Sequence, residues 1–254
     1  MTEPVTLTVG DDGVAVLAMN DPEGRNAFSH AFIEALLHKF AAVAEDERAR
    51  VCVLRGMTDV FCSGAHPDLL IALVEGGFAP SDIVLTKVLL DLPIPTVAAM
   101  EGHGVGGGLL VGIACDVVLM AKESRYGANF MNMGFTPGMG TTRLLQRTVG
   151  DHIAHEMMFG GQVFKGAHFE GRTGINYVLP RDQVFDKAMK VARRIAEKPR
   201  FALELLKRNL MIPWRQDFEA TRTAESAMHT ICFAAPETQA LIRDNFPEKF
   251  GGTK

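Results

Sequence analysis

The first half of the chain changes repeatedly between strand-like and helix-like hydrophobic patterns. Residues 5–9 and 14–18 are short apolar segments on either side of the turn Gly10–Gly13, which predicts a β-hairpin. A helix follows, because apolar side chains then recur every three or four positions and Ser29 is a suitable N-cap. The positions with this helical spacing are Phe32, Leu36, Phe40 and Val43.

The middle of the chain continues this alternation. Residues 51–54, 96–100 and 115–121 are apolar enough to be buried strands, and residues 67–74 and 109–114 are predicted helices. Another helix is expected from Ser81 to Leu92, ended by Pro93 and Pro95. Strands that alternate with helices predict an α/β fold.

Helical periods dominate after Gly140. Four segments have this spacing, and only residues 175–179 are expected to form a strand; the helical segments are residues 140–160, 182–198, 200–211 and 218–233. We therefore expect an α/β core over residues 1–180 and a helical C-terminal region over residues 181–254.

Composition narrows the class of protein. The 254 residues include 47% hydrophobic and 22% charged residues with a net charge of −4, so a packed core is expected and a nucleic-acid partner is not. The four cysteines have no metal-ligand spacing, so no metal site or disulfide framework is expected. Scattered thiols and the lack of a signal peptide or apolar span predict a cytoplasmic protein that does not enter a membrane.

Two glycine-containing segments are candidates for chemistry. Phe61–Ala65 and Gly104–Gly108 each lie between a predicted strand and a predicted helix. Free N–H groups at two such junctions could converge on one oxygen and stabilise negative charge there. Taken singly, each segment is better explained as a tight turn. Gly104–Gly108 lacks the Lys-Ser/Thr pair of a phosphate-binding loop, which argues against nucleotide binding.

Taken together, an ordered series of motifs resembles the enoyl-CoA hydratase (crotonase) family over nearly the whole chain. The matching segments are Arg25–Phe28, Phe61–Ala65, Pro95–Gly108, Cys115–Asp116, Gly134–Gly140, Gly161–Gly166 and Gly174–Pro180. The resemblance implies a crotonase-like spiral of ββα units, with C-terminal helices that assemble a homotrimer or a hexamer.

The resemblance also implies roles for particular residues. The N–H groups of Ala65 and Gly107 would form an oxyanion hole for a thioester carbonyl. The pantetheine arm would pass Arg25, Ala27 and Ser63. His66 stands where the family usually has an acidic residue, and we expect it to lie in the substrate pocket.

This chain departs from the hydratases at both of their glutamates. Leu110 and Phe130 occupy those positions, and neither side chain can transfer a proton. Water addition is therefore not expected. An apolar pocket containing Leu110 and Phe130 would favour enolate chemistry without water.

The chain resembles more specifically the hydratase-like decarboxylases of polyketide β-branching cassettes. These enzymes lack both glutamates and carry a lysine and a C-terminal histidine, at the places of Lys87 and His229. Ile83 occupies the place of a tyrosine found in some relatives, and Glu225 is spaced to orient His229. The residues alone also allow Lys87 to extend to water and His229 to be a packing or surface histidine.

The expected function is decarboxylation of a 3-methylglutaconyl-type thioester on an acyl carrier protein, without a cofactor. Lys87 and His229 would divide two roles, pairing with the carboxylate and protonating the dienolate, and the sequence does not divide them. Two alternatives remain. One is an isomerase or another enolate-forming crotonase, and the other is a catalytically silent scaffold.

Overall fold

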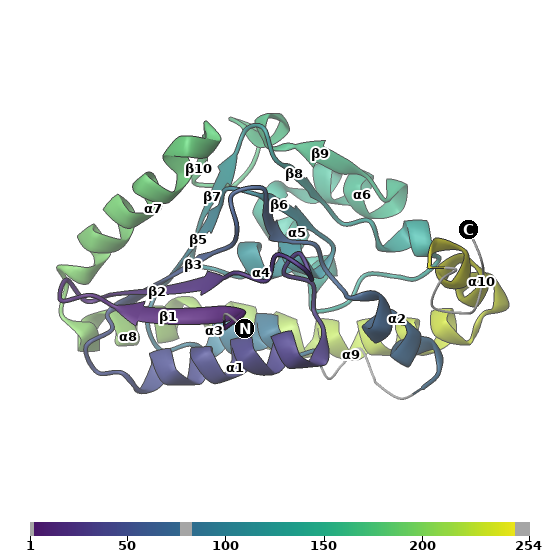
Figure 1. Cartoon of the computed structure of the whole chain (residues 1–254), viewed down its shortest axis with the longest axis horizontal. Helices are drawn as coiled ribbons and strands as arrows, with labels where there is room; N and C mark the ends of the chain where they lie inside the picture. Colours follow the sequence, from purple (N-terminus) through teal and green to yellow (C-terminus); the bar gives the residue numbers. More distant parts are fainter. Residues whose placement is uncertain (1–2, 77–82, 247–254) are drawn as a thin grey trace.

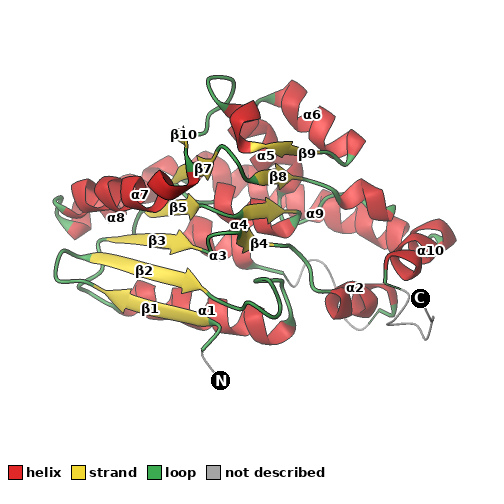
Figure 2. Cartoon of the chain, turned by 45° about the horizontal axis from the view of Figure 1, so that its top comes forward, coloured by secondary structure: helices red, strands yellow, loops and turns green. Residues whose placement is uncertain are grey.

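The computed structural model describes residues 3–76 and 83–246, and within them it contains two β-sheets (Figures 1 and 2). The larger sheet has the order β1-β2-β3-β5-β7-β10, and only its β1–β2 hairpin is antiparallel. Its strands are β1 (Val5–Val9), β2 (Val14–Met19), β3 (Val51–Arg55), β5 (Thr96–Met100), β7 (Val117–Ala121) and β10 (Tyr177–Leu179).

The smaller sheet has the order β4-β6-β8-β9, with β9 antiparallel to β8. Its strands are β4 (Val60–Cys62), β6 (His103–Val105), β8 (Arg125–Gly127) and β9 (Val163–Lys165). Because β4 leads into one helix and β6 into another, this sheet brings the two glycine-containing junctions side by side.

Helices cover both faces of the larger sheet. On one face, α7 (Arg181–Ala196) lies along β3, β5 and β7 (Figure 1). Its buried alanines pack on these strands. On the other face, the main core includes side chains of α1 (His30–Glu45), α2 (Pro67–Val74), α3 (Leu85–Asp91) and α4 (Gly107–Ile113). The α/β fold class is thereby confirmed.

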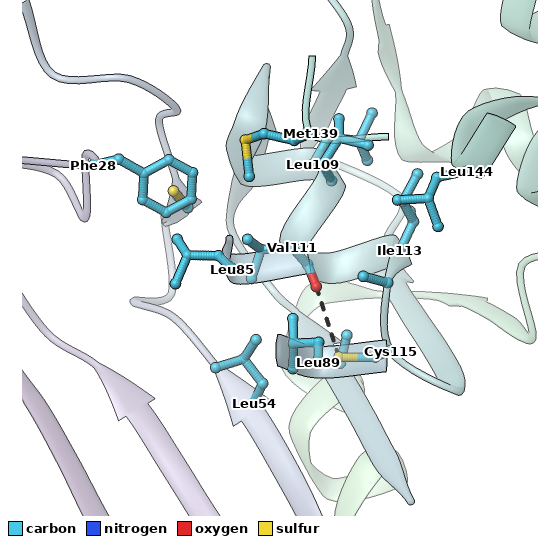
Figure 3. Close-up of a cluster of buried hydrophobic side chains, with 14 of the residues drawn as sticks. Phe28, Leu54, Leu85, Leu89, Leu109, Val111, Ile113, Cys115, Met139 and Leu144 are labelled. Carbon is cyan, nitrogen blue, oxygen red and sulfur yellow. Dashed lines mark hydrogen bonds between the residues drawn. The ribbon is translucent and has the colours of Figure 1, made fainter. Parts of the chain in front are cut away.

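The short helix α4 lies deep in this core. Figure 3 shows Leu109, Val111 and Ile113 of α4 among side chains of α3 and of later segments. The seven residues of α4 are all buried. An apolar helix in an apolar core gains its stability from burial, so its position is fixed by packing on all sides.

The remaining helices lie in the second half of the chain. They are α5 (Thr141–Val149), α6 (Asp151–Gly160), α8 (Arg200–Leu210), α9 (Ile212–Ala234) and α10 (Pro236–Asn245). The long helix α9 contacts α2, α3 and α5, and α10 folds back against α2. The C-terminal helices therefore pack against elements of the first half of the chain.

Several boundaries differ from the prediction. Residues 140–160 form two helices instead of one, because Gly150 has φ 85° and ψ 156° and ends the first. Strand β9 and helix α10 were not expected, and β6 lies in a segment expected to be a turn. Ser81 and Asp82, the expected start of α3, lie outside the described residues. The division of the chain at residue 180 stays a prediction.

The buried ammonium of Lys207 links α8 to Asp116, just before β7, and to the end of α3. The Lys207 ammonium lies 2.9 Å from Asp116 and donates hydrogen bonds to the carbonyls of Leu89 and Ile94. The Asp116 carboxylate also accepts from the N–H and hydroxyl of Thr96. These contacts satisfy a lysine that is only 4% exposed and fix the C-terminal end of α3.

The described residues contain neither a membrane-spanning helix nor a metal-binding cluster. Over the described ranges, none of the helices combines the length and the apolar character needed to span a bilayer. The same ranges contain no cluster of three or more histidine, cysteine or acidic side chains arranged to hold a metal ion.

Candidate active site

A cavity of about 340 Å³ lies where the two glycine-containing junctions, α9 and the chain after α10 meet. Its lining is mostly apolar, with three asparagines, one serine and one histidine. No aspartate, glutamate, lysine or arginine lines it among the described residues. A carboxylate or an enolate inside would therefore meet few charged or hydrated groups.

Two backbone N–H groups in this cavity have no partner in the described structure. Ala65 and Gly107 both line the cavity, and neither N–H donates a hydrogen bond to a described residue. A Cβ atom placed on Gly64 would lie only 3.6 Å from the nitrogen of Gly107, so the two junctions are in contact. The arrangement leaves two neighbouring donors for one oxygen, as an oxyanion hole requires.

The surrounding backbone explains why these donors are free. Phe28 donates to the carbonyl of Gly64 at 2.7 Å and accepts from His66 at 3.2 Å, so the Ala65 N–H points away from Phe28. Gly107 is the first residue of α4, where an N–H has no partner within the helix. Gly64 has φ +89°, a conformation that glycine adopts without strain.

His229 of α9 is the titratable side chain that lines the described cavity. Its Nε2 lies 2.7 Å from the carbonyl oxygen of Thr136. A carbonyl only accepts, so Nε2 carries a proton and Nδ1 is left without a partner in the described structure. His229 is 5% exposed, and burial lowers its pKa, while the hydrogen bond to Thr136 opposes this change. The imidazole is therefore neutral over a wider pH range than in water.

The predicted contact between Glu225 and His229 is wrong. The Glu225 carboxylate accepts hydrogen bonds from the N–H of Gly140 at 2.7 Å and from the N–H and hydroxyl of Thr142 at 2.9 and 2.8 Å. It therefore caps the start of α5, and Thr136 orients the histidine instead. Burial raises the pKa of Glu225, and its three hydrogen bonds oppose this rise.

The predicted pocket residues fall into two groups. Ser63, Ile83 and Phe130 line the cavity, together with Ala65 and Gly107, the two residues expected to form an oxyanion hole. Four others do not line it. Leu110 is completely buried in the core, and Ala27 is also buried. The ring of His66 accepts the Asp68 N–H at 3.2 Å and caps α2. Arg25 is exposed beside Ser63.

Lys87 is not brought to the cavity. Its ammonium lies 2.7 Å from Asp91 and 3.5 Å from Glu219, and its side chain is 40% exposed. The hydrogen bond to Asp91 is the main reason that the pKa of Lys87 is raised, while burial opposes the rise. Lys87 therefore extends to the surface, which is the arrangement that the residues alone also allowed, and two carboxylates neutralise it there.

Several cavity residues were missed from the sequence. Asn129, Asn132 and Asn245 all line the cavity, and the Thr136 carbonyl holds the histidine. Asn129 directly precedes Phe130, which occupies the place of a hydratase glutamate. This neighbouring position was the signal that could have identified Asn129 as a cavity residue. Asn245 gave no signal, because it reaches the cavity only through the unexpected helix α10.

Known proteins match this chain over nearly its whole length. The family model for enoyl-CoA hydratase/isomerase matches residues 10–250. The bacillaene synthase decarboxylase PksI of Bacillus subtilis is 34% identical over 239 residues, covering 94% of this chain and 96% of PksI.

Two solved structures are also similar to this chain. The decarboxylase domain of CurF from Lyngbya majuscula has a TM-score of 0.89 and 35% identity, covering 96% of this chain and 100% of that one. A structure from a dehydratase/decarboxylase enzyme couple involved in polyketide β-branching has a TM-score of 0.90 and 34% identity, covering 94% of this chain and 95% of that one.

Proposed function

The chain belongs to the enoyl-CoA hydratase/isomerase family, as its sequence motifs predicted, and we propose that it decarboxylates a 3-methylglutaconyl-type thioester carried by an acyl carrier protein in polyketide β-branching. The observation that carries this proposal is the cavity. It keeps two free N–H donors, but it is lined by a phenylalanine, Phe130, and by no carboxylate of a described residue with which to activate water. The names of the similar decarboxylases support the same reaction class.

The proposed reaction begins with cleavage of the bond between the substrate carbon and its carboxylate. The electron pair of that bond moves through the conjugated system to the thioester oxygen, and CO2 leaves. The N–H groups of Ala65 and Gly107 stabilise the negative oxygen of the resulting dienolate. The apolar lining, including Phe130 and Phe135, excludes water that would solvate the carboxylate. The thioester itself accepts the electrons, so the proposal needs no cofactor beyond the pantetheine arm.

We assign proton transfer to His229. Its Nε2–H is held by Thr136, so Nδ1 is the nitrogen that can exchange a proton with a ligand. A carboxylate entering the cavity raises the pKa of this imidazole, because the opposite charge favours the protonated form. The imidazolium then donates the Nδ1 proton to a carbon of the dienolate after CO2 has left.

We propose that Lys87 pairs with the substrate carboxylate after leaving Asp91. Exposed ion pairs are weak, so the exchange of one carboxylate for another costs little. Helix α3, which carries Lys87, is attached to the cavity wall through the Thr86 hydroxyl, which donates to the carbonyl of Met139 at 2.8 Å. The pantetheine arm of the acyl carrier protein would enter past Ser63 and the exposed Arg25. The homotrimer stays a prediction.

Lys87→Ala is expected to lower turnover by about 10- to 100-fold, as for the loss of a hydrogen bond to a charged group. Steady-state kinetics with a carrier-bound substrate measure this change. Arg215→Ala is the matched control, since it removes the other cation on Asp91, at 2.8 Å, and leaves Lys87 in place. Wild-type turnover in both variants would contradict the proposal, because it would mean that Lys87 only forms an ion pair with Asp91.

The proposed function is tested by incubating the purified protein with a 3-methylglutaconyl carrier thioester labelled with carbon-13 in its carboxylate. Release of labelled CO2 that depends on the protein is expected. Conversion of simple CoA thioesters without CO2 would instead identify an isomerase. A protein that binds thioesters but changes none of them would be a scaffold.

A further inference from the structure

Asn129 presents a side-chain amide to the cavity that the rest of the described structure does not use. Asn132 donates its amide to the carbonyl of Gly161 at 3.0 Å, and Asn245 donates to Leu241 at 2.8 Å. The half-buried Asn129 amide makes no side-chain hydrogen bond to a described residue, and it does not cap the 3-10 helix η2 (Phe130–Met133) that follows it. An amide without a partner in an apolar cavity is costly unless a ligand or water satisfies it.

The amide lies at the thioester end of the cavity. A Cβ atom placed on Gly106 would stand 3.5 Å from Oδ1 of Asn129, and Gly106 is joined directly to the Gly107 nitrogen. Phe130, the residue after Asn129, has its ring centroid 6.0 Å from that of Phe135. The Phe135 and His229 centroids are 6.3 Å apart. Asn129 is therefore beside the two N–H donors, and the rings of Phe130 and Phe135 link this part of the cavity wall to His229.

We propose that Asn129 is a third hydrogen-bond donor to the thioester oxygen, beside the N–H groups of Ala65 and Gly107. This inference rests on the proposed function. A negative oxygen only accepts, so it selects the orientation in which Nδ2 of Asn129 points toward it. The oxygen and nitrogen of an asparagine amide exchange places by a half-turn about χ2, and their partners decide between the two orientations.

The neutral amide suits this position chemically. As CO2 leaves, negative charge grows on the thioester oxygen, and a donor aimed at that oxygen binds the dienolate more tightly than the substrate. The amide has no ionisable proton near neutral pH, so it leaves protonation to His229. Asn129 would therefore act on turnover more than on substrate binding.

Kinetics provide the first test. Asn129→Ala and Asn129→Asp are both expected to lower kcat by about 10²-fold, the typical effect of losing one oxyanion-hole donor, with a much smaller change in KM. Aspartate keeps the size of the side chain but offers only acceptors, so a role in packing alone would be retained in this variant. Wild-type kcat in Asn129→Asp would overturn the proposal. Thermal unfolding of each variant shows that the fold is kept.

A spectroscopic measurement tests the contact without the reaction. The probe is a 3-methylcrotonyl pantetheine thioester with carbon-13 at its carbonyl, which has no carboxylate to lose. Infrared difference spectra of the bound probe should show a higher carbonyl stretching frequency in Asn129→Ala than in wild type, because a donor has been removed. Asn245→Ala should keep the wild-type frequency, since its amide already donates to Leu241.

The two measurements separate the two proposals. An unchanged carbonyl frequency in Asn129→Ala would overturn the assignment of Asn129, whatever the reaction. A shifted frequency in this variant, together with a wild-type protein that releases no CO2 from the carrier-bound substrate, would retain Asn129 as a thioester ligand and overturn the proposed decarboxylation.

Discussion

His229→Gln is expected to lower turnover by about 10²–10⁴-fold, the usual contribution of a positioned proton-transfer group. Glutamine keeps an N–H donor for the carbonyl of Thr136, which His229 contacts at 2.7 Å, but it cannot carry the transferred proton. The loss should therefore appear in activity and not in the folded structure. Steady-state kinetics and circular dichroism on the purified variant measure both.

The control for this substitution is His152→Gln, which makes the same chemical change on an exposed residue of α6. It should retain wild-type turnover. If His229→Gln also retains wild-type turnover, proton transfer belongs to another group and the assignment of His229 is wrong.

The pH dependence of kcat/KM gives a second test of His229. Burial lowers the pKa of this histidine in the free protein, so its imidazole becomes protonated at a lower pH than that of an exposed histidine. Because the substrate complex needs the imidazolium, kcat/KM should fall as pH rises through the lowered pKa of the free protein. The residual activity of His229→Gln should lack this fall.

Gly108→Ala is expected to remove most activity and to lower the free energy of unfolding by about 1–3 kcal/mol, as overpacking does. A Cβ atom at Gly108 would overlap the carbonyl of Cys62, with the carbonyl carbon only 2.7 Å away. The start of α4 must then move away from β4. This movement separates the N–H groups of Gly107 and Ala65, so turnover should fall by at least the roughly 10²-fold effect of losing one donor.

Gly160→Ala is the matched control, because Gly160 also lies in a helix but its Cβ would meet only the flexible side chain of Gln162, at 3.1 Å. Urea unfolding and turnover should be close to wild type for this variant. If Gly108→Ala has wild-type turnover, the close approach of α4 to β4 does not position the oxyanion hole.

Local features of the fold were predictable because their causes lie within a few residues. The hairpin follows from its turn, and Ser29 caps α1 by accepting the N–H of Phe32 at 3.2 Å. Strand β9 was missed because it forms through pairing with β8, which lies about forty residues earlier in the chain and is not visible in local periodicity. The break at Gly150 depends on a positive φ that helical spacing alone does not indicate.

In the candidate site too, features that depend on short motifs were predicted, and features that depend on contacts distant in sequence were not. The backbone donors of Ala65 and Gly107 were predicted because the ordered series of short motifs resembles that of the enoyl-CoA hydratase family. Leu110 was misplaced because an apolar side chain on α4 is fully buried in the core, whereas a glutamate there would have to reach polar surroundings. The partners of Lys87 and His229 include Glu219 and the Thr136 carbonyl, which are distant in sequence. Only the folded chain brings them together.

The most direct test of the central claim is the intact mass of the carrier-bound 3-methylglutaconyl thioester after incubation with wild-type protein in D2O. The account predicts a product that has lost CO2 and gained one deuterium on carbon, since the dienolate takes its proton from an exchangeable group. A product heavier than the substrate by one D2O would contradict the account, because it would mean that the cavity around Phe130 activates water after all.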